Sequence, residues 1–125
     1  MPKTQSIPSL TAKAQKLFNA HIRQRDSEGG YFTCISCGQT KSTDQMDAGH
    51  YVPVKNGSFL RFEPDNVHGE CKGCNGFNEF HLVPYRKNLI EKIGLERVEW
   101  LEANQRTVKK WTRAELMEII EKYKI

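Results

Sequence analysis

The sequence predicts a single α+β domain in which a short β-hairpin lies between two cysteine pairs and helices flank it on both sides. The cysteines occur as Cys34-x-x-Cys37 and Cys71-x-x-Cys74, and 33 residues (38–70) separate the pairs. Apolar residues recur at helical spacing near both ends of the chain. A length of 125 residues suits one domain with a modest core, so we treat 1–125 as a single unit.

The N-terminal part predicts a loose arm followed by one amphipathic helix. Residues 1–8 contain two prolines and no apolar periodicity, so we expect an arm there. We expect a helix over 9–28, with Ser9 as its N-cap and Gly29-Gly30 as its stop. Its buried stripe consists of Leu10, Ala14, Leu17, Phe18 and Ile22.

The central part, 34–80, predicts a ββα unit held by the cysteines. Residues 31–33 favour a short strand leading into the first pair, and 38–43 favour a polar turn. We expect a strand over 45–54, a turn at Asn56-Gly57 and a return strand over 59–62. Residues 76–81 suit either a short helix or a loop.

The C-terminal part, 82–125, predicts two or three helices. Pro84 suits the first turn of a helix that reaches Ile93, and Gly94 suits its stop. A second helix is expected over 95–103. The capping box Thr112-x-x-Glu115 predicts the start of the last helix.

Composition narrows the class of protein only modestly. A net charge of +4 gives a mild bias towards polyanions, weaker than that of a protein that coats DNA. No apolar run approaches the length of a membrane span, and the first residues lead into no apolar signal core. We therefore expect a cytosolic protein that does not contact the membrane.

The two cysteine pairs predict a structural zinc site. Each pair supplies two thiolates to a tetrahedral ion, and four thiolates leave no open position for catalysis. In a reducing cytosol such pairs bind metal more often than they form disulfides. The alternative is two unconnected thiol pairs, or a redox motif.

Three polar residues in and after the hairpin suggest phosphodiester chemistry. His50 can act as a general base near neutral pH, and Asn66 can restrain its imidazole through a hydrogen bond. Asn75 directly follows the second cysteine pair and can offer an oxygen to a hard cation. Taken singly, His50 also suits a structural histidine and Asn66 a turn residue. Their order between and after the cysteine pairs is the more specific signal.

With these motifs in place, the sequence resembles the HNH nucleases, or ββα-metal superfamily. Within that group it is similar to the NinG (Rap) recombination proteins of lambdoid phages. The resemblance covers most of the chain, and its motifs are 18–25, Cys34-Ile-Ser-Cys-Gly38, Asp47-Ala-Gly-His-Tyr51, 60–62, Asp65-Asn-Val-His-Gly69, Cys71, Cys74-Asn75, Tyr85-Arg86, 93–95 and Val98-Glu99.

The resemblance implies an endonuclease that cleaves branched DNA in recombination, in the host bacterial cytoplasm if a phage encodes it. It implies His50 as general base, Asn66 as its orienting residue, and Asp47 with Asn75 as ligands of a catalytic Mg²⁺ or Mn²⁺. Many HNH enzymes place the acidic ligand directly before the base, where this chain has Gly49. Asp47 lies on the same strand face as that position and can replace the ligand only if Gly49 leaves room.

A second departure concerns His81. The family tends to have Ser-Gly-Asn where this chain has Glu79-Phe80-His81. His81 is then either a further metal ligand or a helix-cap residue, and we favour the cap. For His68 we favour a structural hydrogen bond beside the cysteines over a metal or phosphate contact.

Five cations flank the expected centre and are candidate phosphate contacts, with Arg61 the first choice. The others are Lys55, Lys72, Arg86 and Lys87. If the substrate is a four-way junction, its two-fold symmetry makes a homodimer the expected form. The rival hypothesis is a non-catalytic zinc module that binds nucleic acid or a protein partner, which Gly49 and the mild charge both favour.

Overall fold

The computed structural model describes residues 5–124, so the first four residues of the expected arm lie outside the described part. Helix α1 spans Ile7–Arg25 rather than 9–28. Its N-cap is Ser6, not Ser9, because the Ser6 hydroxyl accepts a hydrogen bond from the Ser9 amide at 3.2 Å. Pro8 does not delay the helix, since a proline in the first turn lacks only a donor that has no partner there.

The helix ends three residues early because the next segment forms a sheet. Gly29 and Gly30 have φ values of 59° and 84° and turn the chain between β1 (Ser27–Glu28) and β2 (Tyr31–Thr33). Strand β3 (Thr40–Ser42) pairs with β2 and completes an antiparallel sheet in the order β1-β2-β3. The expectation of a turn over 38–43 is therefore wrong: only Gly38, with φ 73°, turns the chain back after Cys37.

A two-stranded antiparallel ribbon carries the centre of the molecule. Strand β4 (Met46–His50) pairs with β5 (Val67–Cys71), and the register places Asp47 opposite Glu70 and Gly49 opposite His68. The expected return strand over 59–62 is wrong, because Ser58–Leu60 forms a single 3-10 turn. The expected strand over 45–54 stops at His50 because the Val52 amide bonds to the Asn66 side chain instead of to a neighbouring strand.

Four helices complete the chain after the ribbon. Helix α2 (Lys72–Phe77) follows β5 directly, and α3 spans Leu82–Ile93. Gly94, with φ 91°, separates α3 from α4 (Leu95–Ala103), as the sequence suggests. Helix α5 (Arg113–Tyr123) begins with the expected capping box, in which Thr112 and Glu115 bond to each other's backbone amides.

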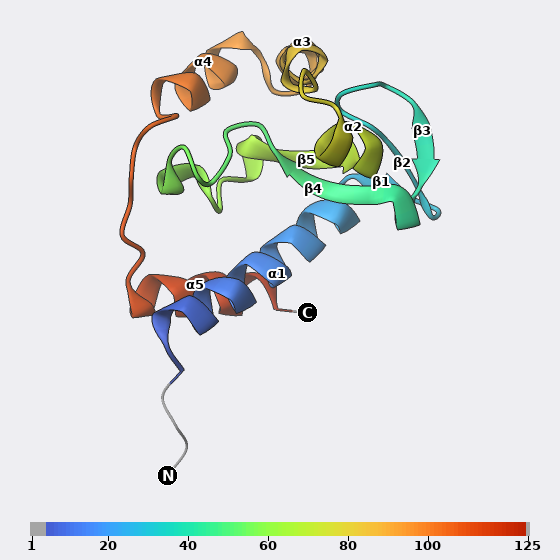
Figure 1. Cartoon of the computed structure of the whole chain (residues 1–125). Coiled ribbons are helices and arrows are strands. Elements are labelled where there is room, and N and C mark those ends of the chain that lie inside the picture. The colour runs from blue at the N-terminus through green and yellow to red at the C-terminus, as the bar shows by residue number, and fades with distance from the viewer. Residues whose placement is uncertain (1–4, 125) are drawn as a thin grey trace.

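The ribbon lies between two helical layers. Figure 1 shows α1 and α5 packed side by side on one side of β4 and β5, with α3 and α4 on the other. One core cluster joins α1 and α5 to the ribbon through Phe18, Ile22, Val67 and Leu116. A second cluster joins α3 and α4 to the loop after β4 through Val52, Leu60, Tyr85, Leu89 and Leu101. The ribbon is thus held from both faces.

Candidate functional site

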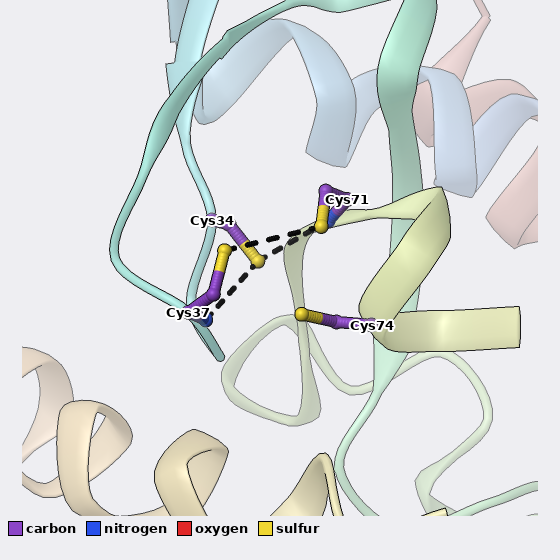
Figure 2. Close-up of side chains that lie close together, drawn as sticks. All are labelled: Cys34, Cys37, Cys71 and Cys74. Carbon is purple, nitrogen blue, oxygen red and sulfur yellow. Dashed lines mark hydrogen bonds between the residues drawn. The ribbon is translucent and has the colours of Figure 1, made fainter. Parts of the chain in front are cut away.

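The four cysteines lie together at the end of the ribbon. Cys34 and Cys37 come from the turn after β2, Cys71 ends β5, and Cys74 lies in α2 (Figure 2). All four sulfur atoms lie within 4.8 Å of one another, and Cys37 Sγ is 4.0 Å from Cys71 Sγ. Sulfur ligands of a tetrahedral zinc are about 3.8 Å apart. The cluster therefore fits a structural metal ion such as zinc.

The surroundings of the sulfur atoms suit thiolates bound to a cation. The amides of Cys37 and Cys71 donate to Cys34 Sγ at 3.4 Å and 3.3 Å. Burial and the neighbouring Cys71 thiol raise the pKa of Cys74 far above its ordinary range. Four thiolates this close repel one another, so they can ionise together only around a positive ion.

His50 lies at the end of β4 with its ring fixed by backbone. Its Nε2 is 3.1 Å from the Arg61 carbonyl oxygen. A carbonyl only accepts, so Nε2 carries the proton and Nδ1 holds the lone pair of the neutral ring. Burial lowers the pKa of His50 below 6.5, and the positive charge of Arg61 adds to this, while carbonyl contacts partly offset it. The imidazole is therefore a neutral base at pH 7.

Asn66 does not bond to His50, contrary to the expectation from sequence. Its side chain is fully buried, accepts from the Val52 amide at 2.8 Å and donates to the Val52 and Leu60 carbonyls at 3.1 Å and 3.3 Å. Leu60 precedes Arg61, whose carbonyl holds His50. Asn66 therefore positions the imidazole indirectly, by fixing the loop between the two strands.

Asp47 and Asn75, 28 positions apart, meet in the structure. Asp47 Oδ2 lies 3.0 Å from the Asn75 side-chain amide, and Asp47 Oδ1 lies 2.6 Å from Lys72 Nζ. These contacts outweigh the opposing effect of burial and lower the pKa of Asp47. Alternate residues of a strand point to opposite faces, so Asp47 and Gly49 share one face of β4 and His50 points to the other.

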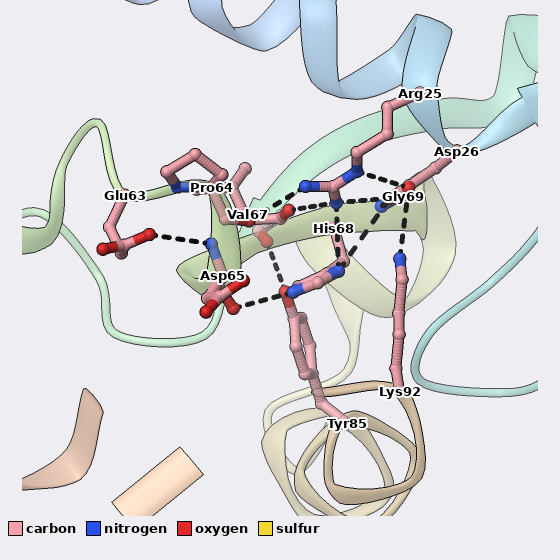
Figure 3. Close-up of polar contacts among 11 residues, drawn as sticks. Arg25, Asp26, Glu63, Pro64, Asp65, Val67, His68, Gly69, Tyr85 and Lys92 are labelled. Carbon is pink, nitrogen blue, oxygen red and sulfur yellow. Dashed lines mark hydrogen bonds and ion pairs between the residues drawn. The ribbon is translucent and has the colours of Figure 1, made fainter. Parts of the chain in front are cut away.

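His68 is part of a buried network at the end of α1 (Figure 3). Arg25 Nη2 lies 3.1 Å from His68 Nδ1, and His68 Nε2 lies 2.7 Å from the Asp65 carbonyl oxygen. Arginine only donates, so Nδ1 accepts and Nε2 donates, which is the neutral ring. Burial first, then the charges of Lys92 and Arg25, lower the pKa of His68 to about 4.

Asp26 anchors the other end of this network. Its carboxylate accepts from the Gly69 amide at 2.8 Å and pairs with Arg25 at 2.7 Å and with Lys92 at 3.1 Å. Burial opposes ionisation, but these donors outweigh it and hold the pKa of Asp26 at about 2. The network connects α1 to β5 and α3. The hydrogen bonds of His68 are therefore structural, and within residues 5–124 its ring makes no hydrogen bond to a cysteine sulfur.

Sequence reasoning missed Glu70. Its side chain is fully buried in β5, accepts a hydrogen bond from the Ser36 hydroxyl, and lies 2.5 Å from His81 Nδ1 through Oε2. His81 occupies the N-cap position of α3, but its side chain makes no capping bond. A glutamate beside Cys71 was the available signal. Its position could not be predicted with 59–62 as the return strand, because only the pairing of β4 with β5 places Glu70 beside Asp47 and Gly49.

Most of the expected phosphate contacts are engaged within the protein. Arg61 donates to Gln15 at 2.7 Å, Lys72 pairs with Asp47, and Arg86 pairs with Glu102 at 2.7 Å. Lys55 is exposed, and among residues 5–124 no ion pair is recorded for it. The structure thus favours Lys55 over Arg61 as a cation available to a phosphate.

Comparison with known proteins assigns the family. The family model described as "Bacteriophage Lambda NinG protein" matches residues 3–125. The chain belongs to the NinG family. NinG membership places it among bacteriophage proteins, and the NinG match covers nearly its whole length.

Individual NinG relatives agree with this assignment. Protein ninG of Escherichia phage 933W is 42% identical over 111 residues, which cover 89% of this chain and 53% of the relative. The ninG proteins of Salmonella phage P22 and Escherichia phage lambda are 40% and 41% identical over the same length, with 52% of each relative covered. The chain therefore spans about half the length of these curated NinG relatives.

No solved structure gave a significant match. Over the described part of this NinG chain, none of the helices has both the length and the apolar character that crossing a bilayer requires.

Proposed function

We propose that this chain is a metal-dependent endonuclease of the HNH (ββα-metal) type that hydrolyses phosphodiester bonds in DNA. The contact between Asp47 and Asn75 carries the proposal, because it joins β4 to α2 beside the thiol cluster. The order β4, β5, α2 is a two-stranded ribbon followed by a helix, as the ββα name requires. In many HNH enzymes the acidic ligand directly precedes the base, and Asp47 shares the strand face of that position, Gly49.

His50 is the proposed general base. Its Nδ1 lone pair takes a proton from the attacking water while Nε2 stays bonded to the Arg61 carbonyl. Asp47 and the carbonyl oxygen of Asn75 are the proposed ligands of a divalent cation, which supplies Lewis-acid stabilisation of the departing 3′ oxygen. For Asn75 to bind a cation its amide must turn, because its nitrogen now faces Asp47. The product carries a 5′ phosphate.

Branched recombination DNA is the proposed substrate. The NinG family match and the net charge of +4 support a nucleic-acid ligand, and Lys55 offers an exposed ammonium group near the loop that holds His50. A four-way junction has two-fold symmetry, so a homodimer would present one site to each of two strands.

The test is cleavage of a four-way junction, a flap and a linear duplex of matched sequence, in Mg²⁺ and in Mn²⁺. We expect cleavage of the branched substrates, and a loss of about 10²–10⁴-fold in the His50→Ala variant. His21→Ala is the matched control, since His21 is exposed on α1 and should leave the rate unchanged. Full activity of His50→Ala, or no cleavage by the wild type with either cation, would overturn the proposal.

One observation favours a second candidate, a non-catalytic zinc module that binds nucleic acid. The Lys72 ammonium occupies one Asp47 oxygen and the Asn75 amide the other, so a cation must displace both. A gel-shift assay with the same three substrates separates the two functions. Tight binding without cleavage in either metal would establish the module and exclude the nuclease.

A further inference from the structure

Glu70 carries an unusual buried oxygen. Its Oε2 accepts from the Ser36 hydroxyl and faces His81 Nδ1 at 2.5 Å. Its Oε1 is buried and has no hydrogen-bond partner, and over residues 5–124 it is the one buried side-chain nitrogen or oxygen of which this is true. A carboxylate oxygen is costly to bury without a donor or a cation.

The unpartnered oxygen occupies the side-chain space of position 49. A Cβ built on Gly49 would overlap Glu70 Oε1 and would lie 3.0 Å from Glu70 Cβ. The register explains the contact. Glu70 is paired with Asp47 and Gly49 with His68, two residues further along, so Gly49 and Glu70 are diagonal neighbours on one face of the ribbon. Glu70 therefore places a second carboxylate on this face, next to Asp47 and in the space that a side chain at position 49 would occupy.

His81 adds a second ligand of complementary chemistry. Its side chain is 17% exposed, whereas that of Glu70 is fully buried, so an ion can reach the pair only from the His81 side. One carboxylate and one imidazole, with the Ser36 hydroxyl beside them, form an oxygen-and-nitrogen donor set. First-row divalent cations such as Mn²⁺ accept this set, whereas the cysteine cluster selects softer ions.

We propose that Glu70 and His81 bind a divalent cation of the first transition row, separate from the ion of the cysteine cluster. Glu70 supplies the carboxylate that the chain lacks at position 49, and Gly49 leaves the space for it. The cation site is inferred from the contacts around Glu70 and does not depend on the proposed function. Its use in cleavage rests on the proposed function.

Manganese binding to the zinc-loaded full chain tests the site directly. We follow the His81 imidazole signals by NMR during addition of Mn²⁺, which broadens nuclei close to it. Broadening of His81 at substoichiometric Mn²⁺ is the expected result. The His21 signals are the internal control, because His21 lies on α1, on the other side of the ribbon.

Variants then identify the ligands. Glu70→Gln and His81→Ala should each weaken Mn²⁺ binding at least tenfold in a titration of free Mn²⁺ by electron paramagnetic resonance. Asp47→Asn should leave the broadening of His81 in place. Because Glu70 is fully buried and Glu70→Gln can disturb folding, His81→Ala, at a partly exposed position, is the decisive variant. Unchanged zinc content in each variant shows that the cysteine cluster is intact.

Two outcomes would overturn the site. Sharp His81 signals at one equivalent of Mn²⁺ would do so, and so would unchanged Mn²⁺ affinity in His81→Ala. Two other outcomes separate the cation site from the nuclease activity. If His81 is broadened but no DNA is cleaved, the site stands without the nuclease. If DNA is cleaved but the His81 signals stay sharp in Mn²⁺, the chain is a nuclease that does not use this site.

Discussion

The Asn66 side chain accepts a hydrogen bond from the Val52 amide at 2.8 Å and returns one to the Val52 carbonyl at 3.1 Å. Fourteen positions separate the two residues, and the pair closes the loop between β4 and β5 much as a strand partner would. The third bond, to the Leu60 carbonyl, holds the segment whose next residue bonds to His50. One buried amide thereby organises the loop and, through it, the proposed base.

Asn66→Ala should reduce the free energy of unfolding by roughly 2–4 kcal/mol, since three buried backbone groups lose their partner. Asn66→Asp should cost more, because an aspartate keeps the bond from the Val52 amide but repels the two carbonyls. Urea unfolding of the zinc-loaded protein measures both. Asp44→Ala is a suitable control on an exposed turn. A cost below that of the control for Asn66→Ala would contradict this account of the loop.

The cysteine cluster should contain one zinc per chain and should be required for folding. Cys34→Ser and Cys71→Ser each remove a buried ligand, and structural zinc contributes apparent free energies of about 10–16 kcal/mol, more than a small domain has to lose. Elemental analysis and far-UV circular dichroism check the two claims. Gln39→Ser, an exposed change in the same turn, should keep both the zinc and the fold. A folded Cys71→Ser chain without zinc would refute the prediction.

Cleavage should depend on pH through His50. Burial lowers the pKa of this imidazole, so the neutral, basic form persists to lower pH than in a free histidine. We expect the rate to rise with pH to a plateau and to be half-maximal below pH 6.5. Single-turnover cleavage between pH 5 and pH 9 at saturating Mn²⁺ measures the profile. A half-maximal rate well above pH 6.5 would be inconsistent with a desolvated base.

His68 should make the fold less stable in mild acid. Its pKa is about 4 in the folded chain and 6.5 when unfolded, so the unfolded state binds the extra proton first. Stability should therefore be full above pH 6.5 and should decline as the pH falls towards 4, by at most roughly 3 kcal/mol. Below pH 4 this contribution changes no further.

Urea unfolding at several pH values, compared between wild type and His68→Gln, isolates this effect. Glutamine can accept from Arg25 and donate to the Asp65 carbonyl without titrating. The variant should lose less stability than the wild type between pH 6.5 and pH 4.5, whatever its stability at pH 7. His21→Gln should follow the wild type. Parallel curves for wild type and His68→Gln would show that His68 does not carry the acid sensitivity.

Several features of the chain could be predicted from sequence because their signals are local. The pairing of the cysteines, the stop at Gly94, the range of α4 and the capping box at Thr112 each depend on a few neighbouring residues. The contact between Asp47 and Asn75 also agrees with the proposed pair of ligands, although their role as ligands stays a prediction.

Tertiary structure alone decided the partner of β4 and everything that depends on it. The turn signal at Asn56-Gly57 favours 59–62 as the return strand. Residues 67–71 pair with β4 instead, because Val67 packs on α1 and Cys71 joins the thiol cluster. That pairing makes Asn66 a loop clamp and buries His68 against Arg25. It also brings Glu70 over Gly49. Sequence determined which chemical groups the chain has. Their distances depend on strand register, which long-range packing sets and which no local pattern encodes.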